Sequence, residues 1–264
     1  MVDLGAVNAG FSRKAEVYDA YCEGHPVIRW ARRVVRNEVE LSLGRGGSIL
    51  ELNAGTGLDA AYFADKGFPV HATDVADGMV DAIRKKAARH PERLTVQQLS
   101  FTELEKVEGA PFDLVFSNFG GLNCIPDLRL VTRHLNSILK PSGHLVWVVM
   151  PLACPWELAQ ILRGQFHVAT RRFHRDGILA NVEGAQVMTW YHSPKTVRSS
   201  FTPGFRLLHQ RSLSLLCPPS YMDNFPRRFP RLTEFLLRLD GWLGGRFPFR
   251  GWGDFVMYTF RHEP

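Results

Sequence analysis

Residues 46–150 alternate short apolar runs with helical patterns, and this alternation constrains the fold more than any other feature of the chain. The apolar runs are typical of buried strands; they occupy residues 48–52, 69–73, 94–99, 112–117 and 143–150. Between them, apolar residues recur three and four positions apart, which predicts helices at 58–66, 77–89 and 127–139. Strands that alternate with helices predict an α/β fold, a doubly wound parallel sheet with helices on both faces.

The segments on either side break this alternation. Before it, residues 26–43 have the spacing of an amphipathic helix. After it we expect a mixed α and β region: a helix at 156–162, strands at 167–174, 179–183, 186–192 and 205–216, a helix at 232–243 and a last strand at 254–261. The tripeptide Arg175-Asp176-Gly177 suggests a hairpin turn between the first two of these strands.

Composition limits the remaining classes of function. The 264 residues, 45% of them hydrophobic, are enough for one sizeable core. The net charge of +6 comes largely from scattered arginines, so we interpret it as a solubility feature and do not expect nucleic acid as the partner. Four widely spaced cysteines predict free thiols and neither a disulfide framework nor a metal site. The chain shows no secretory signal and no run of about 18 apolar residues, so we expect a cytoplasmic protein.

The turn after the first predicted strand carries the strongest functional signal. Glu51 ends the strand, and Asn53, Gly55 and Gly57 follow in the run ILELNAGTG. A phosphate-binding P-loop would require a lysine after the last glycine, and none stands there. A dinucleotide fingerprint is closer, because the chain matches G-x-G-x-x-A from Gly55 onward and Asp74 follows 19 residues later. However, the carboxylate of Glu51 would repel a pyrophosphate and attract a cation.

Several motifs together resemble those of class I methyltransferases that use S-adenosylmethionine (SAM), in the small-molecule branch of that family. The run ILELNAGTG resembles the first motif, with Asn53 in place of its first glycine; HATDVADGMV resembles the second, FDLVFSNFGGLNCI the fourth-strand motif, and FSRKAEVYDAY the lid segment. The resemblance implies a Rossmann-like, seven-stranded, mostly parallel sheet with one antiparallel strand. It also implies SAM as the cofactor, S-adenosylhomocysteine as its product, and Asp74 as the ligand of the ribose hydroxyls.

The same resemblance assigns a cofactor site. We expect SAM to contact Tyr18, Glu51, Asn53, Gly55, Gly57, Asp74, Val75, Met79, Ser100, Phe101, Asn118 and Phe119. The adenine end departs from the family pattern, because Ser100 and Phe101 stand where an acid often meets the adenine amino group. Methyl transfer requires an aligned acceptor and, for some acceptors, a base. His25 and His192 are our candidates for that base, and we expect no metal.

These assignments divide the chain into four parts: a helical lid at 1–45, a SAM-binding core at 46–150, an inserted α+β substrate-binding region interleaved with late core elements at 151–252, and a final core strand at 253–264. The expected activity is methyl transfer to a small, partly apolar acceptor, with oxygen favoured over carbon and nitrogen. Three alternatives stay open: an RNA methyltransferase, a SAM-binding regulatory protein without catalysis, and an NAD(P)-dependent oxidoreductase. The arginines and aromatic residues at 225–252 also leave open a membrane surface, a lipid-like substrate or a homodimer contact.

Overall fold

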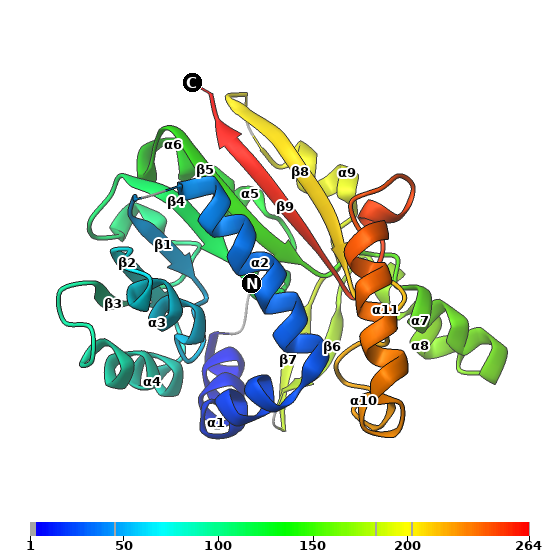
Figure 1. The fold of residues 1–264 in the computed structure, drawn as a ribbon. Helices are drawn as coiled ribbons and strands as arrows, with labels where there is room; N and C mark the ends of the chain where they lie inside the picture. The colour runs from blue at the N-terminus through cyan, green and yellow to red at the C-terminus, as the bar shows by residue number, and fades with distance from the viewer. Residues whose placement is uncertain (1–3, 45, 183, 202, 264) are drawn as a thin grey trace.

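A seven-stranded sheet forms the centre of the protein, as the computed structural model shows for residues 4–44, 46–182, 184–201 and 203–263 (Figure 1). The strand order is β3-β2-β1-β4-β5-β9-β8. These strands are β1 (Ile49–Leu52), β2 (Val70–Asp74), β3 (Leu94–Gln98), β4 (Phe112–Ser117), β5 (Leu139–Val149), β8 (Phe205–Leu213) and β9 (Phe255–His262). β9 pairs antiparallel with both of its neighbours, while the pairs among β1 to β5 are parallel. The predicted mostly parallel sheet with one antiparallel strand is confirmed.

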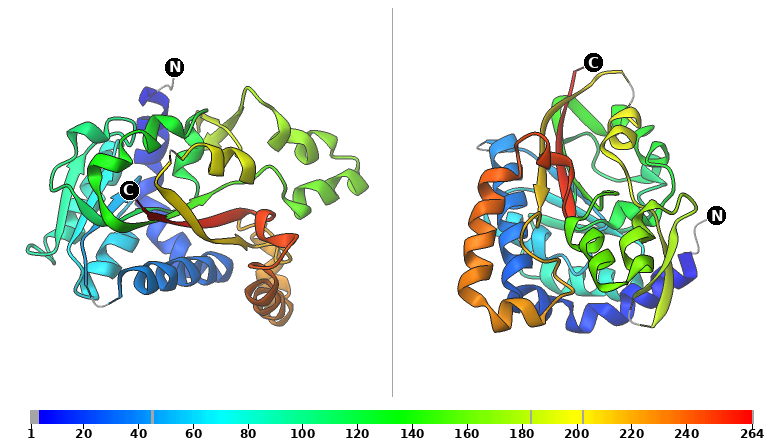
Figure 2. Two further views of the ribbon diagram at one scale, coloured as in Figure 1. Left: turned by 90° about the horizontal axis from the view of Figure 1, so that it is seen from above. Right: turned by 90° about the vertical axis from the view of Figure 1, so that its right-hand side faces the viewer.

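Helices cover both faces of this sheet and enclose two apolar cores (Figures 1 and 2). One face carries α2 (Pro26–Leu43), α3 (Leu58–Asp65), α4 (Asp77–Ala87) and α11 (Pro230–Leu243). The other carries α5 (Arg129–Thr132), α6 (Leu135–Ile138) and α9 (Pro194–Ser199). Because side chains alternate along a strand, each buried strand contributes to both cores; in β1, Ile49 packs in the first and Leu50 in the second.

The bounds of α2 follow from its sequence. Pro26 occupies the first turn, where its missing N–H leaves no hydrogen bond unmade. Val27, Val35 and Val39 are buried at intervals that place them on one face of a helix. Gly44 follows the last turn with a positive φ of 64°, a conformation that glycine adopts readily. The helix predicted at 26–43 is confirmed.

The helix predicted at 127–139 is interrupted. Asp127 does accept a hydrogen bond from the Arg129 N–H at 2.9 Å, as a capping residue would. Between α5 and α6, however, the His134 N–H donates to the Val131 carbonyl and the Ser137 N–H donates to the His134 carbonyl. These bonds span three residues instead of four, so the chain tightens into a turn and the helix divides.

The region after β5 contains a small helical pair and a hairpin. The helical segment predicted at 156–162 is present as α7 (Pro155–Leu158) and the 3-10 helix η3 (Ala159–Arg163). The hairpin pairs β6 (Ile178–Val182) with β7 (Ala185–Thr189). The hairpin turn predicted at 175–177 is wrong, because that segment precedes β6. The strand predicted at 179–183 ends on Glu183, which lies outside the described residues.

The strand predicted at 167–174 is wrong as well. This segment forms α8 (Phe166–Thr170) and the 3-10 helix η4 (Arg171–Phe173). Arg171 and Arg172 both bind the carboxylate of Glu157, at 2.7 and 2.6 Å. Consecutive residues of a strand would point to opposite faces, whereas a helical turn lets both guanidinium groups reach one carboxylate. The helical turn therefore fits the pairing of both arginines with Glu157.

The N-terminal helix α1 (Leu4–Gly24) lies below the sheet in Figure 1, at the edge where the parallel strands end. It packs against α4 and against the β6–β7 hairpin. Asn8 and Asp77 exchange two hydrogen bonds, in which the Asn8 side chain donates at 2.8 Å and the Asp77 N–H donates at 2.9 Å. In the part of the chain that the structure describes, no helix is both long and apolar enough to cross a membrane.

Candidate functional site

The turn after β1 is built from three residues with left-handed backbone. Asn53 has φ 44°, Gly55 has φ 58° and Gly57 has φ 77°. The Asn53 side chain accepts a hydrogen bond from the Ser117 hydroxyl at 2.7 Å and donates to the Asn118 carbonyl at 3.2 Å. Asn53 thus takes the left-handed conformation expected of it and also joins the turn to the end of β4.

Gly55 and Gly57 of this turn have different surroundings. A Cβ placed on Gly55 would meet, among the described residues, only the edge of the Tyr18 ring at 4.0 Å. A Cβ on Gly57 would crowd Ile83 of α4 at 3.2 Å. Gly55 therefore faces open space beside α1, where a ligand can approach the backbone, while Gly57 permits close packing of two helices. The contact of SAM with Gly57 stays a prediction.

Asp74 ends β2 directly beside this turn. Its carboxylate accepts hydrogen bonds from the Gly55 N–H at 2.9 Å and the Ala76 N–H at 3.0 Å. Burial raises the pKa of Asp74 to about 6, against the opposing effect of these N–H groups. A carboxylate has about four acceptor positions, so two remain for hydroxyl groups of a ligand.

Glu51 is a buried acid whose carboxyl has an oxygen without a hydrogen-bond partner among the described residues. Its side chain is 2% exposed, and its Oε2 atom has no hydrogen-bond partner among the described residues. Burial, and next the nearby Asp59 carboxylate, raise the pKa of Glu51 well above its usual range. A buried carboxyl of this kind favours a cationic ligand, because a positive charge beside it would offset the cost of burying the ionised form.

Asp59, in the first turn of α3, is the partner of several buried groups. Arg32 binds it, the Arg36 Nε atom lies 2.6 Å from its second oxygen, and the Asn118 amide donates to it at 3.0 Å. Burial alone would raise the pKa of Asp59, but the two guanidinium groups outweigh burial and lower it. Apart from Asn118, this cluster was not among the predicted site residues: an acid in the first turn of a helix is common, and no local pattern links Asp59 to Arg32, which lies 27 residues away.

Helix α1 is fastened beside the turn by Asp19. The Thr56 hydroxyl donates to the Asp19 carboxylate, and the Lys86 ammonium lies 2.6 Å from that carboxylate. Lys86 also donates to the Thr56 carbonyl at 2.8 Å. Tyr18, one position before Asp19, lies next to Gly55, and burial raises its pKa. Helix α1 thus meets the glycine turn, with Tyr18 at the contact.

The remaining predicted cofactor residues lie around the ends of β2 and β3. The Gln98 amide at the end of β3 donates to the Val75 carbonyl at 3.2 Å. Ser100 is buried, and its hydroxyl is 2.8 Å from that of Thr102. Phe101 is partly buried against the second core. Met79, by contrast, is fully buried on the inner side of α4, a position typical of a core residue.

Phe119, the second residue after β4, contacts both an arginine and another aromatic ring. Its backbone is left-handed, with φ 49°. The Arg32 guanidinium lies 4.8 Å from the centre of its ring, and Phe255 at the start of β9 meets the ring edge-on at 5.6 Å. Phe119 thus connects the Asp59 cluster with the region after β5.

A second charged cluster lies after β5, around Glu157. Arg171 and Arg172 bind Glu157, and Arg172 also binds Asp254 at 2.8 Å. The Tyr221 hydroxyl donates to Glu157 at 3.3 Å. Two carboxylates therefore face two guanidinium groups, and their charges balance.

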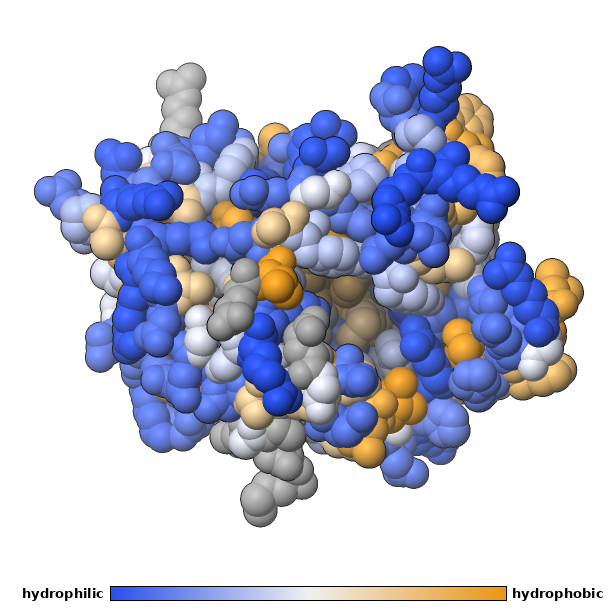
Figure 3. Space-filling view, turned by 90° about the horizontal axis from the view of Figure 1, so that it is seen from below, coloured by the Kyte–Doolittle hydropathy of each residue, from blue (hydrophilic) through white to orange (hydrophobic). Residues whose placement is uncertain are grey.

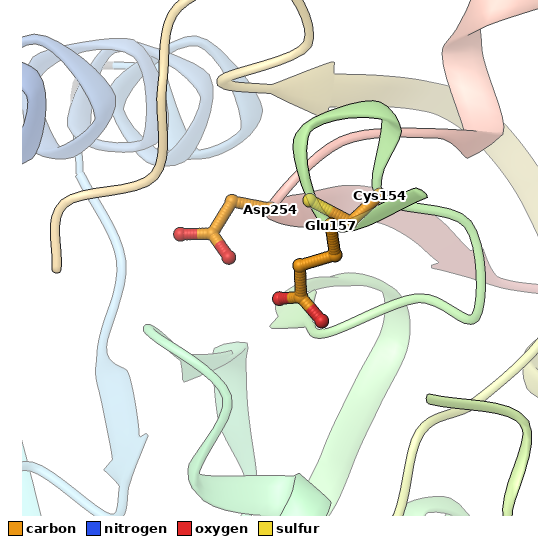
Figure 4. Close-up of side chains that lie close together, drawn as sticks. All are labelled: Cys154, Glu157 and Asp254. Atoms are coloured by element: carbon orange, nitrogen blue, oxygen red, sulfur yellow. The ribbon is translucent and has the colours of Figure 1, made fainter. Parts of the chain in front are cut away.

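Figure 4 shows that Cys154, Glu157 and Asp254 approach one another in this cluster. Potential ligand atoms of these three residues lie within 4.8 Å of one another, as metal ligands do. However, Arg171 and Arg172 already neutralise both carboxylates, and burial raises the pKa of the Cys154 thiol to about 12. A protonated thiol and two paired carboxylates are a poor donor set for a cation, so we assign no metal here.

The two candidate bases lie in different parts of the structure. His25 is buried where α1 meets α2, with Nε2 3.5 Å from the Asp223 carboxylate and no hydrogen bond to either ring nitrogen among the described residues. The neighbouring Tyr21 hydroxyl donates to the same carboxylate at 3.1 Å. His192 is buried after β7, where its backbone N–H donates to the Met150 carbonyl at 3.1 Å. Burial lowers the pKa of both histidines.

Comparison with known proteins gives consistent matches. Residues 49–143 match the family model of a methyltransferase domain. The malonyl-[acyl-carrier protein] O-methyltransferase of Serratia marcescens is 28% identical over 176 residues, which cover 63% of this chain and 62% of that protein. The demethylmenaquinone methyltransferase of Clavibacter sepedonicus is 34% identical over 101 residues, 38% of this chain and 40% of that protein. The chain thus spans less than two thirds of the length of these relatives.

A solved structure shows the same fold. The Burkholderia thailandensis 1,6-didemethyltoxoflavin-N1-methyltransferase, with 1,6-didemethyltoxoflavin and S-adenosylhomocysteine bound, matches with a TM-score of 0.59 at 16% identity. The match covers 98% of this chain and 88% of that one. The likeness therefore extends over the N-terminal helices, the sheet and the region after β5.

Proposed function

Because this chain belongs to the class I SAM-dependent methyltransferases, we propose that it transfers a methyl group from SAM to a small, partly apolar acceptor. The observation that carries the proposal is the unpartnered, buried carboxyl of Glu51 beside the open face of Gly55. A dinucleotide would bring a pyrophosphate to this acid, whereas SAM brings an ammonium and a sulfonium. The charge of the site favours SAM over the dinucleotide.

The residues around the turn fit the separate parts of SAM. Glu51 accepts the ammonium group, and Asp74 has two free acceptor positions for the ribose hydroxyls. Val75, Ser100 and Phe101 line the position of the adenine ring, beyond the ends of β2 and β3. Bound there, SAM supplies a methyl group already activated by its sulfonium centre. The protein therefore has to bind SAM and the acceptor, orient them for transfer, and exclude water.

The acceptor is held by aromatic residues on the same edge of the sheet. Figure 3 views the protein from below, onto the edge where the parallel strands end, and shows a hollow near the middle of this face. From the contacts and not from this view, we propose that Phe119, Phe255, Tyr191 and Tyr221 form an aromatic wall for the acceptor. The rings of Phe119 and Phe255 lie 5.6 Å apart. Arginines lie against three of the rings, with separations of 4.8 Å for Arg32–Phe119, 5.0 Å for Arg172–Tyr191 and 5.5 Å for Arg171–Tyr221.

This wall indicates a partly apolar acceptor. Phe119, Tyr191 and Phe255 are partly exposed and Tyr221 is exposed, so their rings are available to a ligand. The charges of the Glu157 cluster are balanced and offer no free counter-ion. In this division of work, residues 1–45 close the cofactor site and residues 151–252 supply the acceptor side. An oxygen nucleophile is supported by the name of the Serratia relative, an O-methyltransferase.

Of the two histidines, His25 is the better candidate for a base. The Asp223 carboxylate lies 3.5 Å from its Nε2 and can orient the ring, as a carboxylate does in other histidine-dependent sites. Because its pKa is lowered, His25 is neutral near pH 7 and can accept a proton. A His25→Gln variant should lose turnover and keep SAM affinity, whereas His192→Gln should keep both.

The first test is calorimetric titration of SAM, S-adenosylhomocysteine and NADPH into the folded protein. We expect the first two to bind and NADPH not to bind. Asp74→Ala should abolish SAM binding, while Asp81→Ala, an exposed acid on α4, should leave it unchanged. Binding of NADPH instead of SAM would favour the oxidoreductase. Binding of SAM without turnover on phenolic, carboxylic and RNA acceptors would favour the regulatory protein.

A further inference from the structure

We propose that the exposed face of α11, with α10 (Asn224–Arg228) before it, seats the protein on the surface of an anionic phospholipid membrane. This inference does not depend on the methyltransferase function. It rests on the apolar side chains, the charges and the position of this helix.

The two sides of α11 have different environments. Leu237 and Asp240 are buried against the body of the protein. On the opposite side, Phe235 is 55% exposed and Trp242 is 58% exposed, and the two lie seven residues apart on one face of the helix. Leu232 is exposed on the same side. The helix therefore presents an apolar strip to the outside.

Arginines border this strip. Residues 225–252 contain six arginines and two acids; one of the acids, Asp240, is buried, and the other, Glu234, pairs with Arg238 at 3.0 Å. Arg231 and Arg238 are exposed, at helix positions that flank Phe235 and Trp242. The outward charge of this segment is therefore strongly positive, which complements anionic headgroups.

Trp242 illustrates why this face suits a membrane surface. The Arg246 guanidinium lies 3.8 Å from the centre of the Trp242 rings. Tryptophan and phenylalanine reside well at the depth of lipid headgroups, and arginine can extend its charge back toward the phosphates. Basic residues beside bulky apolar ones on one helix face are typical of helices that lie in the membrane interface.

The neighbouring helix α2 extends the basic surface. α2 and α11 lie side by side on one face of the sheet (Figures 1 and 2). Arg29 and Arg33 of α2 are exposed, and they line a depression of about 420 Å³ together with Glu23. Among the described residues, neither arginine forms an ion pair. The two arginines therefore add positive charge to the helix that neighbours α11.

The experiment is co-sedimentation of the full chain with vesicles, either of phosphatidylcholine alone or of phosphatidylcholine mixed with phosphatidylglycerol. We expect binding to the mixed vesicles alone, and weaker binding as salt is added, because salt screens the attraction. Arg231→Ala combined with Arg238→Ala should lower the partition coefficient roughly thirty-fold, since each basic residue contributes about a factor of five. Phe235→Ala should lower it about tenfold or more.

Leu162→Ala is the matched control. Leu162 is 90% exposed, but it lies on η3, away from α11. This variant should bind vesicles like the unmodified protein, and all variants should keep their circular dichroism spectrum. Equal loss in Leu162→Ala and Phe235→Ala would overturn the assignment of the face.

Three other results would overturn the membrane proposal itself. The first is no difference between neutral and anionic vesicles. The second is a concentration-dependent dimer that Phe235→Ala dissociates, in a protein that does not bind vesicles, since that face would then join two copies of the chain. The third is retention on RNA without retention on vesicles. Loss of methyl transfer with vesicle binding intact would count against the proposed function alone.

Discussion

Two clusters of buried charge lie near the carboxyl edge of the sheet, and they differ in their balance. Around the glycine turn, three carboxyl groups, those of Glu51, Asp59 and Asp74, face the guanidinium groups of Arg32 and Arg36. After β5, the two carboxylates of Glu157 and Asp254 face Arg171 and Arg172. The first cluster has one acid in excess, and the second has none.

The difference in charge balance suits the two clusters to different roles: the cluster around the glycine turn to binding a ligand, and the Glu157 cluster to holding the structure together. A buried ion pair whose charges match contributes little net stability but becomes strongly destabilising once one partner is removed. An unmatched buried carboxyl is instead held partly protonated until a cation arrives. The Glu157 cluster thus fixes α7, η4 and the start of β9 to one another. The cluster around the turn is left ready for a cationic ligand.

The largest effect should come from removing one partner of the balanced cluster. Glu157→Ala leaves Arg172 buried and short of negative charge, so the free energy of unfolding should fall by about 3–5 kcal/mol. Glu51→Gln should change it by less than about 1 kcal/mol, because the Glu51 carboxyl has an unpartnered oxygen. Urea denaturation at pH 7 measures both. Similar losses in the two variants would remove the distinction between the clusters.

The second effect is on the pH dependence of stability. Asp74 has its folded pKa raised to about 6, so its contribution is fully present below the unfolded pKa of about 3.9 and is lost as pH rises through about 6. Over this window, the unfolding free energy attributable to Asp74 should fall by about 2–3 kcal/mol. Denaturation at pH 4.5 and pH 7 should show a smaller fall in Asp74→Asn.

Glu157 provides the opposite sign for comparison. Burial would raise its pKa, but the two arginines outweigh burial and lower it. Its contribution is therefore present above the unfolded pKa of about 4.3 and is lost as pH falls through the folded pKa. If Glu157→Gln and Asp74→Asn changed the pH profile in the same direction, the contrast between the clusters would be wrong.

A third effect is the release of protons when SAM binds. In the free protein the raised pKa keeps a fraction of Glu51 protonated, and an ammonium beside it favours the ionised form. Titration near pH 6 in buffers of different ionisation enthalpy should show release of up to about one proton. Glu51→Gln should lower this number, and Glu157→Gln should not. Proton uptake on binding would contradict the role given to Glu51.

The smallest effect concerns the turn between the clusters. Asn53→Gly keeps the left-handed backbone and removes two side-chain hydrogen bonds to the end of β4. We expect a loss of about 1 kcal/mol in unfolding free energy and SAM affinity within about threefold of the original. Asn53→Val, which resists a positive φ, should cost more than Asn53→Gly. The same urea and calorimetric measurements test both variants.

The sheet and the turn could be predicted from the sequence because their determinants are local. Hydrophobic periodicity marks each buried strand, and the left-handed positions carry Asn and Gly in the sequence itself. The spacing of Asp74 in the sequence, 19 residues after Gly55, predicted its place beside the turn. The structure places it there, with its carboxylate bound to the Gly55 N–H. Its contact with SAM remains a prediction.

The charged clusters could not be predicted, because their members come from separate elements. Arg32 and Asp59 lie on different helices, 27 residues apart, and no local pattern joins them. Arg171 and Arg172 pair with Glu157 from a helical turn, where local propensity suggested a strand. In both clusters the paired residues come from elements that are separate in the sequence. Sequence spacing does not encode such a pair.

The fastening of α1 has a consequence for the order of events in turnover. Asp19 joins α1 to Thr56 and Lys86, and Tyr21 near the end of α1 bonds to the Ser220 carbonyl. Helix α1 thus connects the glycine turn with the loop that contains Ser220. If α1 covers the cofactor as we propose, both parts would move together when the site opens. We expect the cofactor to enter first and its product to leave last. Product inhibition would show this order if S-adenosylhomocysteine competes with SAM and the methylated product does not. An opening of the site that occurs once per cycle would then limit the rate of turnover.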